Sequence, residues 1–338
     1  MPIALDATYS LGRNLSGIGV YSRELLFGMA RAYPQERFLF CYRPHRFLRA
    51  VLDPLPENAV RRLLRGTPPG DVFHALNQRV DMPGRRTVAT FHDLFAITGE
   101  YSTPEFRTRF AEQARQAARQ SDLIIAVSHF TAKQAEDHLK VEPSRIRVIP
   151  HGVRVPTEPS ATREPLILCV GAIQRRKNVA RLVKAFERMP ESWRLALAGA
   201  ADGFGAAEEL HSVELSPRKA HIEVLGYVSP GELEALYRRA SIFAFPSLDE
   251  GFGMPVLDAM AQGVPVVTSR RSALPEVAGD AALLVDPENI DEIADALARL
   301  AGDPALSSDL ARRGCERALQ FSWEAAVART LAVYDELR

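Results

Sequence analysis

Short apolar runs alternate along the chain with longer segments of helical periodicity. In the first half the runs are IALDA (3–7), RFLFCY (37–42), TVATFHD (87–93), LIIAVS (123–128) and RIRVIP (145–150). Buried parallel strands read as near-continuous apolar runs, and each crossover between them needs a connection long enough for a helix. The pattern therefore predicts a parallel α/β sheet.

The same rhythm restarts after residues 151–165, which are rich in Pro, Thr and Ser. The second series is LILCVG (166–171), RLALAG (194–199), IEVLG (222–226), SIFAFPS (241–247), VPVVTS (264–269) and AALLVD (281–286). Three helical segments, roughly 289–301, 304–319 and 322–337, close the chain. We expect two Rossmann-like parallel-sheet domains with a Pro-rich linker and with ligands bound at the strands' carboxyl ends, in a central cleft.

Composition and charge narrow the class of partner only slightly. The chain has 338 residues, with 42 basic and 42 acidic side chains that cancel, so no global charge points to nucleic acid. The part through Val155 carries 22 basic and 15 acidic residues, and the remainder carries 20 and 27. An anionic partner for the first half and a chance imbalance on a solvated surface both stay open.

The cysteines and the N-terminal residues indicate the cellular compartment in which we expect the protein. Cys41, Cys169 and Cys315 lie far apart in apolar stretches, which excludes a disulfide framework or a zinc site and fits a reducing compartment. The N-terminal residues MPIALDATYSLGRN have no basic and apolar leader pattern, and no run of 18 apolar residues occurs. We expect a cytoplasmic protein without a membrane span.

The segment SLDEGFGMPVLDAMAQGVPVV (247–267) predicts a short helix that begins after Gly-Phe-Gly (251–253). Glu250 and Asp258 bracket its N-terminus, where free N–H groups attract anions. Carboxylates are good partners for sugar and ribose hydroxyls. A tight turn with a carboxylate that complements the helix dipole is the alternative.

A second loop, within VGAIQRRKNVARLVKAF (170–186), places Arg175, Arg176 and Lys177 between a strand and a helix, with Asn178 as the expected N-cap. Adjacent cations at the start of a helix favour phosphate binding, although an exposed basic turn would look similar. A diphosphate needs a metal or fixed cations to neutralise it, and the sequence has no Asp-x-Asp pair. Fixed cations are therefore favoured.

Two elements of the first half complete the candidate site. Gly17 and Gly19 follow the first strand and precede a long helix, but the third position of a dinucleotide fingerprint is Ser22. FHDL (91–94) places His92 at a strand end. Close approach of backbone to a ligand and a purely structural histidine are both compatible with these elements.

Taken together, these segments resemble the retaining glycosyltransferases of family 4, which have the GT-B fold. The matched segments are SGIGVYSREL, FHDL, IAVSHFT (125–131), IPHGV (149–153), VGAIQRRKN, residues 225–267, LPEVAGDAALLVDP (274–287) and FSWEAAV (321–327). The family's two glutamates, separated by seven residues, correspond to Glu250 and Asp258, so the second carboxylate is one methylene shorter. Many members read Pro-Asn-Gly-Val where this chain has His151.

The resemblance implies a role for each domain. Residues 1–155 plus 322–338 would form the acceptor-binding domain, with the last helix crossing back to it. Residues 156–321 would bind the donor, a nucleotide-diphosphate sugar, as co-substrate, with no cofactor and no metal required.

The resemblance also assigns residues by position. Arg176 and Lys177 would bind the diphosphate, Glu250 the hydroxyls of the donor sugar, and His92 would lie near the C6 hydroxyl of that sugar. These four form the expected catalytic set. The expected donor-binding residues are Gly17, Gly19, Arg175, Tyr227, Val228, Gly251, Phe252, Gly253, Met254 and Asp258, with Asp258 on the ribose and Tyr227–Val228 at the base.

The expected reaction is metal-independent transfer of a hexose, with retention, to a glycan or lipid-linked acceptor in bacterial polysaccharide or lipopolysaccharide synthesis. Mannose from GDP-mannose is favoured because SGIG and HDL resemble the mannosyltransferase branch. The competing hypotheses are a UDP-sugar-dependent hexosyltransferase, a silent sugar-nucleotide-binding protein, and a sugar-nucleotide epimerase, which would convert the donor without any acceptor.

Arginines of the first half suggest a surface for the acceptor. They are Arg43, Arg46, Arg49, Arg61, Arg62, Arg65, Arg107, Arg109, Arg115 and Arg119. They could hold a lipid-linked diphosphate through peripheral contact with a membrane, or they could be a solvated face. The sequence shows no clear lipid-inserting helix beside them.

Overall fold

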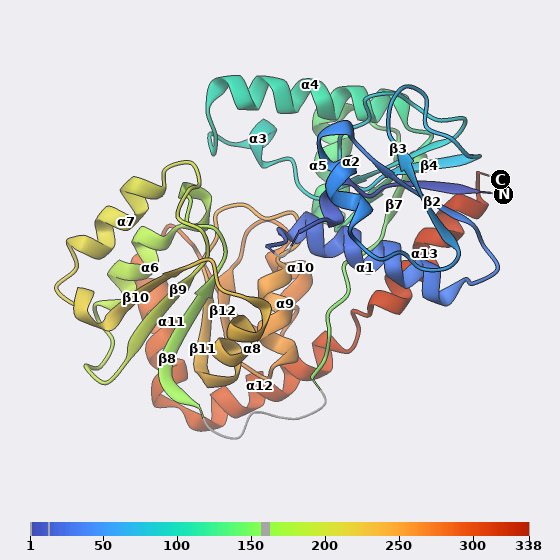
Figure 1. Cartoon of the computed structure of the whole chain (residues 1–338). Coiled ribbons are helices and arrows are strands. Elements are labelled where there is room, and N and C mark those ends of the chain that lie inside the picture. The colour runs from blue at the N-terminus through green and yellow to red at the C-terminus, as the bar shows by residue number, and fades with distance from the viewer. Residues whose placement is uncertain (1, 13, 157–162, 338) are drawn as a thin grey trace. The chain divides into compact units, whose positions relative to one another are not determined.

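The computed structural model describes residues 2–12, 14–156 and 163–337 (Figure 1). The chain divides into two compact units. The N-terminal unit comprises Met1–Thr98, Pro104–Gly152 and Phe321–Arg338, and the C-terminal unit comprises Gly99–Thr103 and Val153–Gln320. The sequence did not predict the assignment of the short segment 99–103 to the C-terminal unit. Of the expected linker at 151–165, residues 157–162 lie outside the described part of the chain.

A seven-stranded parallel sheet forms the centre of the N-terminal unit, in the order β3-β2-β1-β4-β5-β6-β7. Its strands are β1 (Ile3–Asp6), β2 (Phe38–Tyr42), β3 (Ala59–Leu63), β4 (Val72–Ala75), β5 (Thr87–Phe91), β6 (Leu123–Ala126) and β7 (Ile146–Val148). Its helices are α1 (Gly17–Ala32), α2 (Pro44–Val51), α3 (Phe95–Thr98), α4 (Pro104–Gln120), α5 (His129–Leu139) and α13 (Trp323–Asp335).

The C-terminal unit has a six-stranded parallel sheet in the order β10-β9-β8-β11-β12-β13. Its strands are β8 (Glu164–Val170), β9 (Arg194–Ala198), β10 (Ile222–Gly226), β11 (Ala240–Phe245), β12 (Val266–Ser269) and β13 (Ala282–Val285). Its helices are α6 (Val179–Phe186), α7 (Ala206–Glu214), α8 (Pro230–Arg239), α9 (Met254–Ala261), α10 (Leu274–Ala278), α11 (Ile290–Gly302) and α12 (Pro304–Ala318).

Both sheets are doubly wound, because the strand order reverses direction next to the first strand of each unit. The reversal lies between β1 and β4 in one unit and between β8 and β11 in the other. Loops at the carboxyl ends of the two strands that flank a reversal diverge and leave room for a ligand. In the C-terminal unit, the topology therefore predicts a ligand site at the loops after β8 and β11.

The apolar runs form strands because parallel strands are buried on both faces. Every residue of β5 and all four residues of β12 are buried. Helix α1 begins at an N-cap, Ser16, whose hydroxyl accepts a hydrogen bond from the Gly19 amide, and it buries Leu25, Leu26 and Met29. Burial of whole strands and of one helix face explains why periodicity located these elements.

The C-terminal helix belongs to the N-terminal unit. Helix α13 packs against α1, and both helices are seen side by side in Figure 1, in red and blue. A methyl group added at Gly28 of α1 would lie 2.8 Å from Val327 Cγ2 of α13, so the absence of a side chain there allows the close approach.

Two strands were not predicted from the sequence. Strand β3 lies at the edge of its sheet and contains Arg61 and Arg62, so its sequence is not an apolar run. Strand β4 is only four residues long and includes the buried His74. The pattern of apolar residues is weakest at a polar edge strand and in a short strand with a buried polar side chain.

Candidate active site

The loops after β8 and β11 in the C-terminal unit bring three charged side chains together. Lys177 Nζ lies 2.5 Å from Glu250 Oε1, and Arg176 Nη1 lies 2.9 Å from Glu250 Oε2. All three side chains are almost fully enclosed, since their exposed fractions are 12% or less. Residues 73 positions apart in sequence thus form one compact cluster, as the topology requires.

Backbone and hydroxyl contacts fix this cluster in place. The Arg176 carbonyl accepts hydrogen bonds from the Leu248 amide at 2.7 Å and from Ser247 Oγ at 2.9 Å. Ser247 Oγ also lies 2.6 Å from Glu250 Oε1. The Glu250 amide donates to Ser272 Oγ at 3.1 Å. Ser247 and Ser272 are site residues that sequence reasoning missed, because a serine in a loop carries no distinctive signal.

The electrostatics of Glu250 follow from its neighbours. Burial alone would raise the pKa of this carboxyl, but the charges of Arg176 and Lys177, together with hydrogen bonds from Lys177 and Ser247, lower the pKa to about 2. Lys177 Nζ also lies 4.6 Å from the centroid of the Phe245 ring. Glu250 is therefore an ionised counter-ion to two cations at neutral pH.

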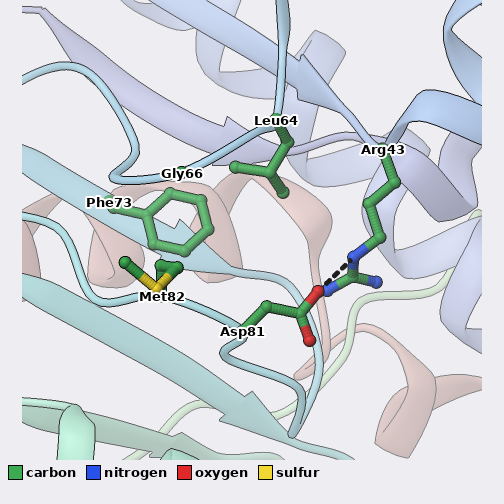
Figure 2. Close-up of a pocket in the computed structure, with 6 residues that line it drawn as sticks. All are labelled: Arg43, Leu64, Gly66, Phe73, Asp81 and Met82. Carbon is green, nitrogen blue, oxygen red and sulfur yellow. Dashed lines mark hydrogen bonds and ion pairs between the residues drawn. The ribbon is translucent and has the colours of Figure 1, made fainter.

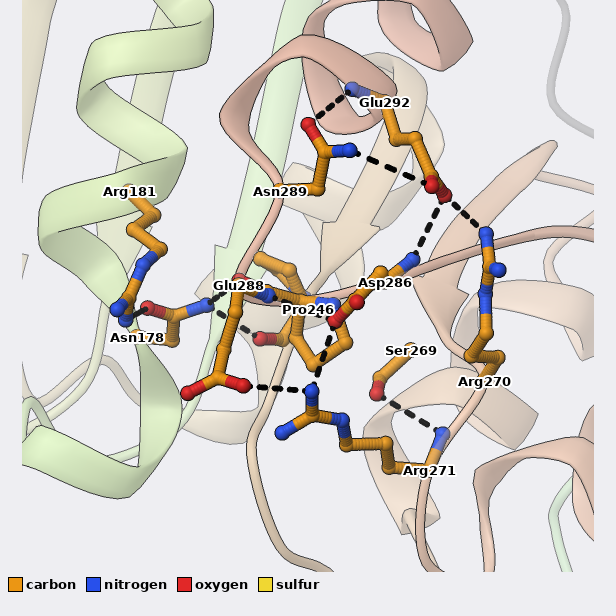
Figure 3. A network of polar contacts seen from close by, with 11 residues as sticks. Asn178, Arg181, Pro246, Ser269, Arg270, Arg271, Asp286, Glu288, Asn289 and Glu292 are labelled. Carbon is orange, nitrogen blue, oxygen red and sulfur yellow. Dashed lines mark hydrogen bonds and ion pairs between the residues drawn. The ribbon is translucent and has the colours of Figure 1, made fainter.

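Asn178 occupies the expected N-cap position, but its side chain does not cap the helix. It precedes α6 with φ 60°, in the left-handed region, and its side chain makes no capping hydrogen bond. Instead its Nδ2 donates to the carbonyls of Pro246 at 2.9 Å and Pro287 at 2.6 Å, and its Oδ1 accepts from Arg181 (Figure 3). Asn178 thus joins the loops that follow β8, β11 and β13.

The same polar network extends over the loops after β12 and β13. Arg271 Nη2 contacts Asp286 at 3.0 Å and Glu288 at 2.6 Å, and Glu292 accepts from the Asp286 amide and from Arg270 (Figure 3). The loops at this edge of the sheet are consequently tied to one another by side chains rather than by packing alone.

The predicted short helix is confirmed as α9. Gly253 is its N-cap residue with φ 103°, a conformation that favours glycine, and a methyl group there would lie 2.5 Å from Leu274 Cδ2. Gly251, Phe252 and Gly253 are buried, and Met254 is half-buried at the first helical position. The free amides of α9 thus begin immediately after the loop that carries Glu250.

Asp258 lies on α9, one turn beyond its start, and is half-buried. Burial raises the pKa of this carboxyl to about 7, since no charge or hydrogen bond among the described residues offsets the desolvation. Its environment is thus the opposite of that of Glu250, whose charge is fully compensated.

The remaining donor-site candidates of the C-terminal unit lie in the loops after β8 and β10. Arg175 is exposed, and its guanidinium carbon lies 5.3 Å from the centroid of the Phe204 ring. Tyr227 is 45% exposed and Val228 is half-buried, directly after β10 and Gly226. The strand they follow, β10, lies two positions from β8 in the sheet.

In the N-terminal unit the candidates occupy the predicted strand end and helix start. His92 follows β5, is 7% exposed, and its Nε2 lies 2.9 Å from the Leu76 carbonyl. Gly17 and Gly19 lie within the first turn of α1 rather than before it. A methyl group at Gly19 would lie 3.0 Å from the Tyr9 carbonyl, so this turn packs tightly on the preceding loop.

The structure removes Arg43 from the proposed anion-binding surface. Its side chain is buried and contacts Asp6 and Asp81, each at 3.1 Å, beside a small pocket lined by Leu64, Phe73 and Met82 (Figure 2). Arg43 is therefore already neutralised by carboxylates. Because Asp6 is the last residue of β1 and Asp81 lies in a loop much later in the chain, the sequence could not show this.

Two more arginines bind backbone carbonyls. Arg61 donates to Ala50 and Asp53, and Arg107 donates to Ala96. Arg109 lies over the Phe106 ring at 5.6 Å. By contrast, Arg46, Arg49, Arg62 and Arg65 form no ion pair with the described residues.

Comparison with known proteins identifies the family. Residues 156–317 match the model of Glycosyl transferases group 1, and residues 16–155 match that of Glycosyltransferase Family 4. The O-antigen chain mannosyltransferase B of Escherichia coli is 31% identical over 283 residues, which cover 79% of this chain and 74% of that protein. The chain belongs to the group 1 glycosyltransferases. The expected enzyme class is confirmed.

Another relative of this glycosyltransferase is the MMP alpha-(1->4)-mannosyltransferase of Mycolicibacterium hassiacum. It is 34% identical over 237 residues, which cover 67% of this chain but only 57% of that protein. The D-inositol 3-phosphate glycosyltransferase of Corynebacterium glutamicum is 31% identical, with 74% of this chain and 66% of that protein covered.

Solved structures confirm the expected GT-B fold of two Rossmann-like units. Sucrose-phosphate synthase from Thermosynechococcus elongatus matches with a TM-score of 0.79 and 22% identity over 99% of this chain and 98% of that one. Anabaena HepE in complex with UDP and glucose matches with a TM-score of 0.75 and 18% identity over 99% of both chains. In the part of this glycosyltransferase that the structure describes, no helix is long and apolar enough to cross a bilayer.

Proposed function

We propose that this enzyme transfers mannose from GDP-mannose to a hydroxyl of a glycan or lipid-linked saccharide, with retention at the anomeric carbon and without a metal, in bacterial polysaccharide or lipopolysaccharide synthesis. The observation that carries the proposal is the pair of Arg176 and Lys177, whose side chains are 12% and 10% exposed, paired with Glu250 in the loop before α9. Two mannosyltransferases among the relatives support the choice of sugar.

In the proposed reaction the bond between the anomeric carbon and the β-phosphate oxygen breaks, and the acceptor oxygen bonds to the same face of that carbon. The acceptor proton passes to the departing phosphate oxygen. Arg176 and Lys177 stabilise the charge of the leaving diphosphate. Glu250 holds hydroxyls of the sugar, Asp258 contacts the ribose, and His92 accepts a hydrogen bond from the sugar.

A thermal-shift panel of GDP, UDP, ADP and their sugar conjugates, each with magnesium or with EDTA, tests the donor. A ligand at 100 times its Kd stabilises the folded state by about 2.7 kcal/mol, a readily measured shift. We expect shifts from GDP and GDP-mannose that EDTA leaves unchanged. A shift from UDP conjugates alone would establish a UDP-sugar donor instead, and a shift that needs magnesium would refute metal independence.

Product analysis separates glycosyl transfer from silent binding and from epimerisation. Incubation of GDP-mannose with a panel of saccharide acceptors should give a product whose NMR coupling shows the anomeric configuration of the donor. An inverted product would contradict retention. Nucleotide binding without transfer or donor hydrolysis on any acceptor would favour a silent binding protein, and conversion of the donor sugar without acceptor would favour an epimerase.

We further propose that the enzyme acts in the cytoplasm at the inner face of the membrane, through a surface on α2 and β3. Leu48, Val51 and Leu52, at the end of α2, are 83%, 54% and 87% exposed. The unpaired Arg49 and Arg62 belong to the same two elements, which pack together. Apolar side chains flanked by free cations suit anionic lipid headgroups over an apolar layer.

Sedimentation with phosphatidylglycerol and phosphatidylcholine vesicles tests this surface. We expect binding to the anionic vesicles that weakens at high salt and on replacement of both leucines, Leu48→Ser with Leu52→Ser. The matched control is Leu215→Ser with Leu319→Ser, since these leucines are 65% and 67% exposed in the C-terminal unit. No binding at low salt, or equal weakening by the control, would contradict the proposal.

A further inference from the structure

His92 is one of four aromatic rings that pack together inside the N-terminal unit. The His151 ring stacks on the His92 ring, with centroids 5.3 Å apart and planes inclined by 18°. The edge of Tyr21 meets both, at centroid distances of 4.7 Å to His92 and 5.0 Å to His151. Trp323, the first residue of α13, lies 6.0 Å from His151.

A chain of hydrogen bonds that begins at its hydroxyl group holds the Tyr21 ring in place. Tyr21 Oη lies 2.9 Å from Thr90 Oγ1, which lies 2.8 Å from His74 Nε2, and His74 Nδ1 lies 2.6 Å from Tyr334 Oη. All of these side chains are buried. The chain of hydrogen bonds runs from α1 through β5 and β4 to α13, so four elements fix the position of Tyr21.

The partner of His92 fixes which nitrogen carries its hydrogen. The Leu76 carbonyl can only accept a hydrogen bond, so Nε2 of His92 must be the protonated nitrogen. Burial lowers the pKa of His92 to about 4, so the ring is neutral at neutral pH and Nδ1 has a free lone pair. Among the described residues, nothing hydrogen-bonds to this Nδ1.

From this geometry we infer that His151 and Tyr21 are positioning residues that hold His92 as a neutral acceptor, with Nδ1 presented to a substrate hydroxyl. The inference rests on the proposed role of His92 at the donor sugar. It gives His151 a role where many family members have asparagine. A flat ring can stack, with an offset, on the face of His92, whereas an amide side chain has no ring to stack.

The backbone at Gly152, next to His151, packs tightly against the start of α13. A methyl group added there would lie within 2.6 Å of three backbone atoms of Ser322 and Trp323. The glycine therefore lets the start of α13 come directly against the backbone next to His151, which brings the Trp323 ring to the His151 ring.

Kinetics of the full-length enzyme with His151→Ala and His151→Phe test the inference. Loss of the stacked ring in His151→Ala should lower kcat at least tenfold and leave the donor KM within about twofold, whereas the flat ring of His151→Phe should restore most of kcat. Adding His151→Ala to His92→Ala should cause no further loss, because both changes remove the same function. Equal losses in His151→Ala and His151→Phe, or additive losses in the double variant, would overturn the inference.

NMR of ¹⁵N-histidine-labelled protein provides a readout that does not depend on activity. We expect the His92 signals, assigned by their absence in His92→Gln, to show a neutral ring protonated on Nε2 at pH 7, and to show mixed tautomers in His151→Ala. A charged or mixed His92 ring in the unaltered protein would overturn the inference. If His92→Ala transfers normally while the tautomer is as expected, only the proposed role of His92 at the sugar fails.

Discussion

Lys177 and Glu250 lie 2.5 Å apart across two loops that are 73 residues apart in sequence. The two residues expected to contact different parts of the donor, its diphosphate and its sugar, therefore contact each other. Glu250 pairs with both cations that are proposed to bind the diphosphate. Under the proposed function, binding of the donor must redistribute these charges, and four variants test how.

Glu250→Gln should strengthen the binding of a free nucleoside diphosphate and weaken transfer. Removal of the carboxylate charge takes the counter-ion away from Arg176 and Lys177 and removes a negative charge that repels phosphate. We expect affinity to rise about tenfold, or about 1.4 kcal/mol, in titration calorimetry. Turnover should fall because the proposed contact to the sugar hydroxyls loses its carboxylate charge and one of its two acceptor oxygens. Unchanged or weaker diphosphate binding would show that Glu250 does not compete with the ligand.

Lys177→Ala should slow transfer by about 10²–10³, the usual loss for one preorganised charge contact at the leaving group. Steady-state rates at saturating donor measure it, and Lys184→Ala, an exposed lysine on α6, is the control. Because Lys177 is buried, Lys177→Met provides a second variant that fills the same space. Turnover like that of the control in either folded variant would refute the phosphate role.

Asn178→Ala should destabilise the C-terminal unit more than Asn178→Gly. Both variants leave the carbonyls of Pro246 and Pro287 without their buried donor, at about 1–3 kcal/mol each. Alanine adds the cost of the left-handed conformation, about 1 kcal/mol, which glycine avoids. Urea denaturation measures both variants. Equal losses would mean that backbone conformation contributes nothing here.

Asp258→Asn should change the dependence of stability on pH. The pKa of Asp258 is raised from 3.8 to about 7, so the folded state favours the neutral carboxyl, and the stability associated with it is lost as pH rises between these values. Relative to the asparagine variant, the unaltered protein should lose stability from pH 5 to pH 8 in thermal melts. Parallel curves would show that Asp258 ionises normally.

Local sequence predicted most of this fold but only the composition of its site. Apolar periodicity located buried strands such as β5 and β12, and the Gly-Phe-Gly segment located the start of α9. The local sequence could not show that Asn178 hydrogen-bonds to two other loops or that Asp6 and Asp81 pair with Arg43. Such contacts depend on which segments the topology brings together. Residue types in the loops suggested phosphate and sugar chemistry, and only the fold shows Glu250 between the two cations.

The assignment of α13 to the N-terminal unit also has a consequence for synthesis on the ribosome. Domains usually fold in the order in which they are translated. Here α1 packs against α13 (Trp323–Asp335), and His74 hydrogen-bonds to the hydroxyl of Tyr334 on the same helix. Helix α13 is translated after all strands of the second sheet. The unit whose translation begins first is thus completed last, so a nascent chain should acquire a folded C-terminal unit while the N-terminal unit still exposes apolar surface to chaperones.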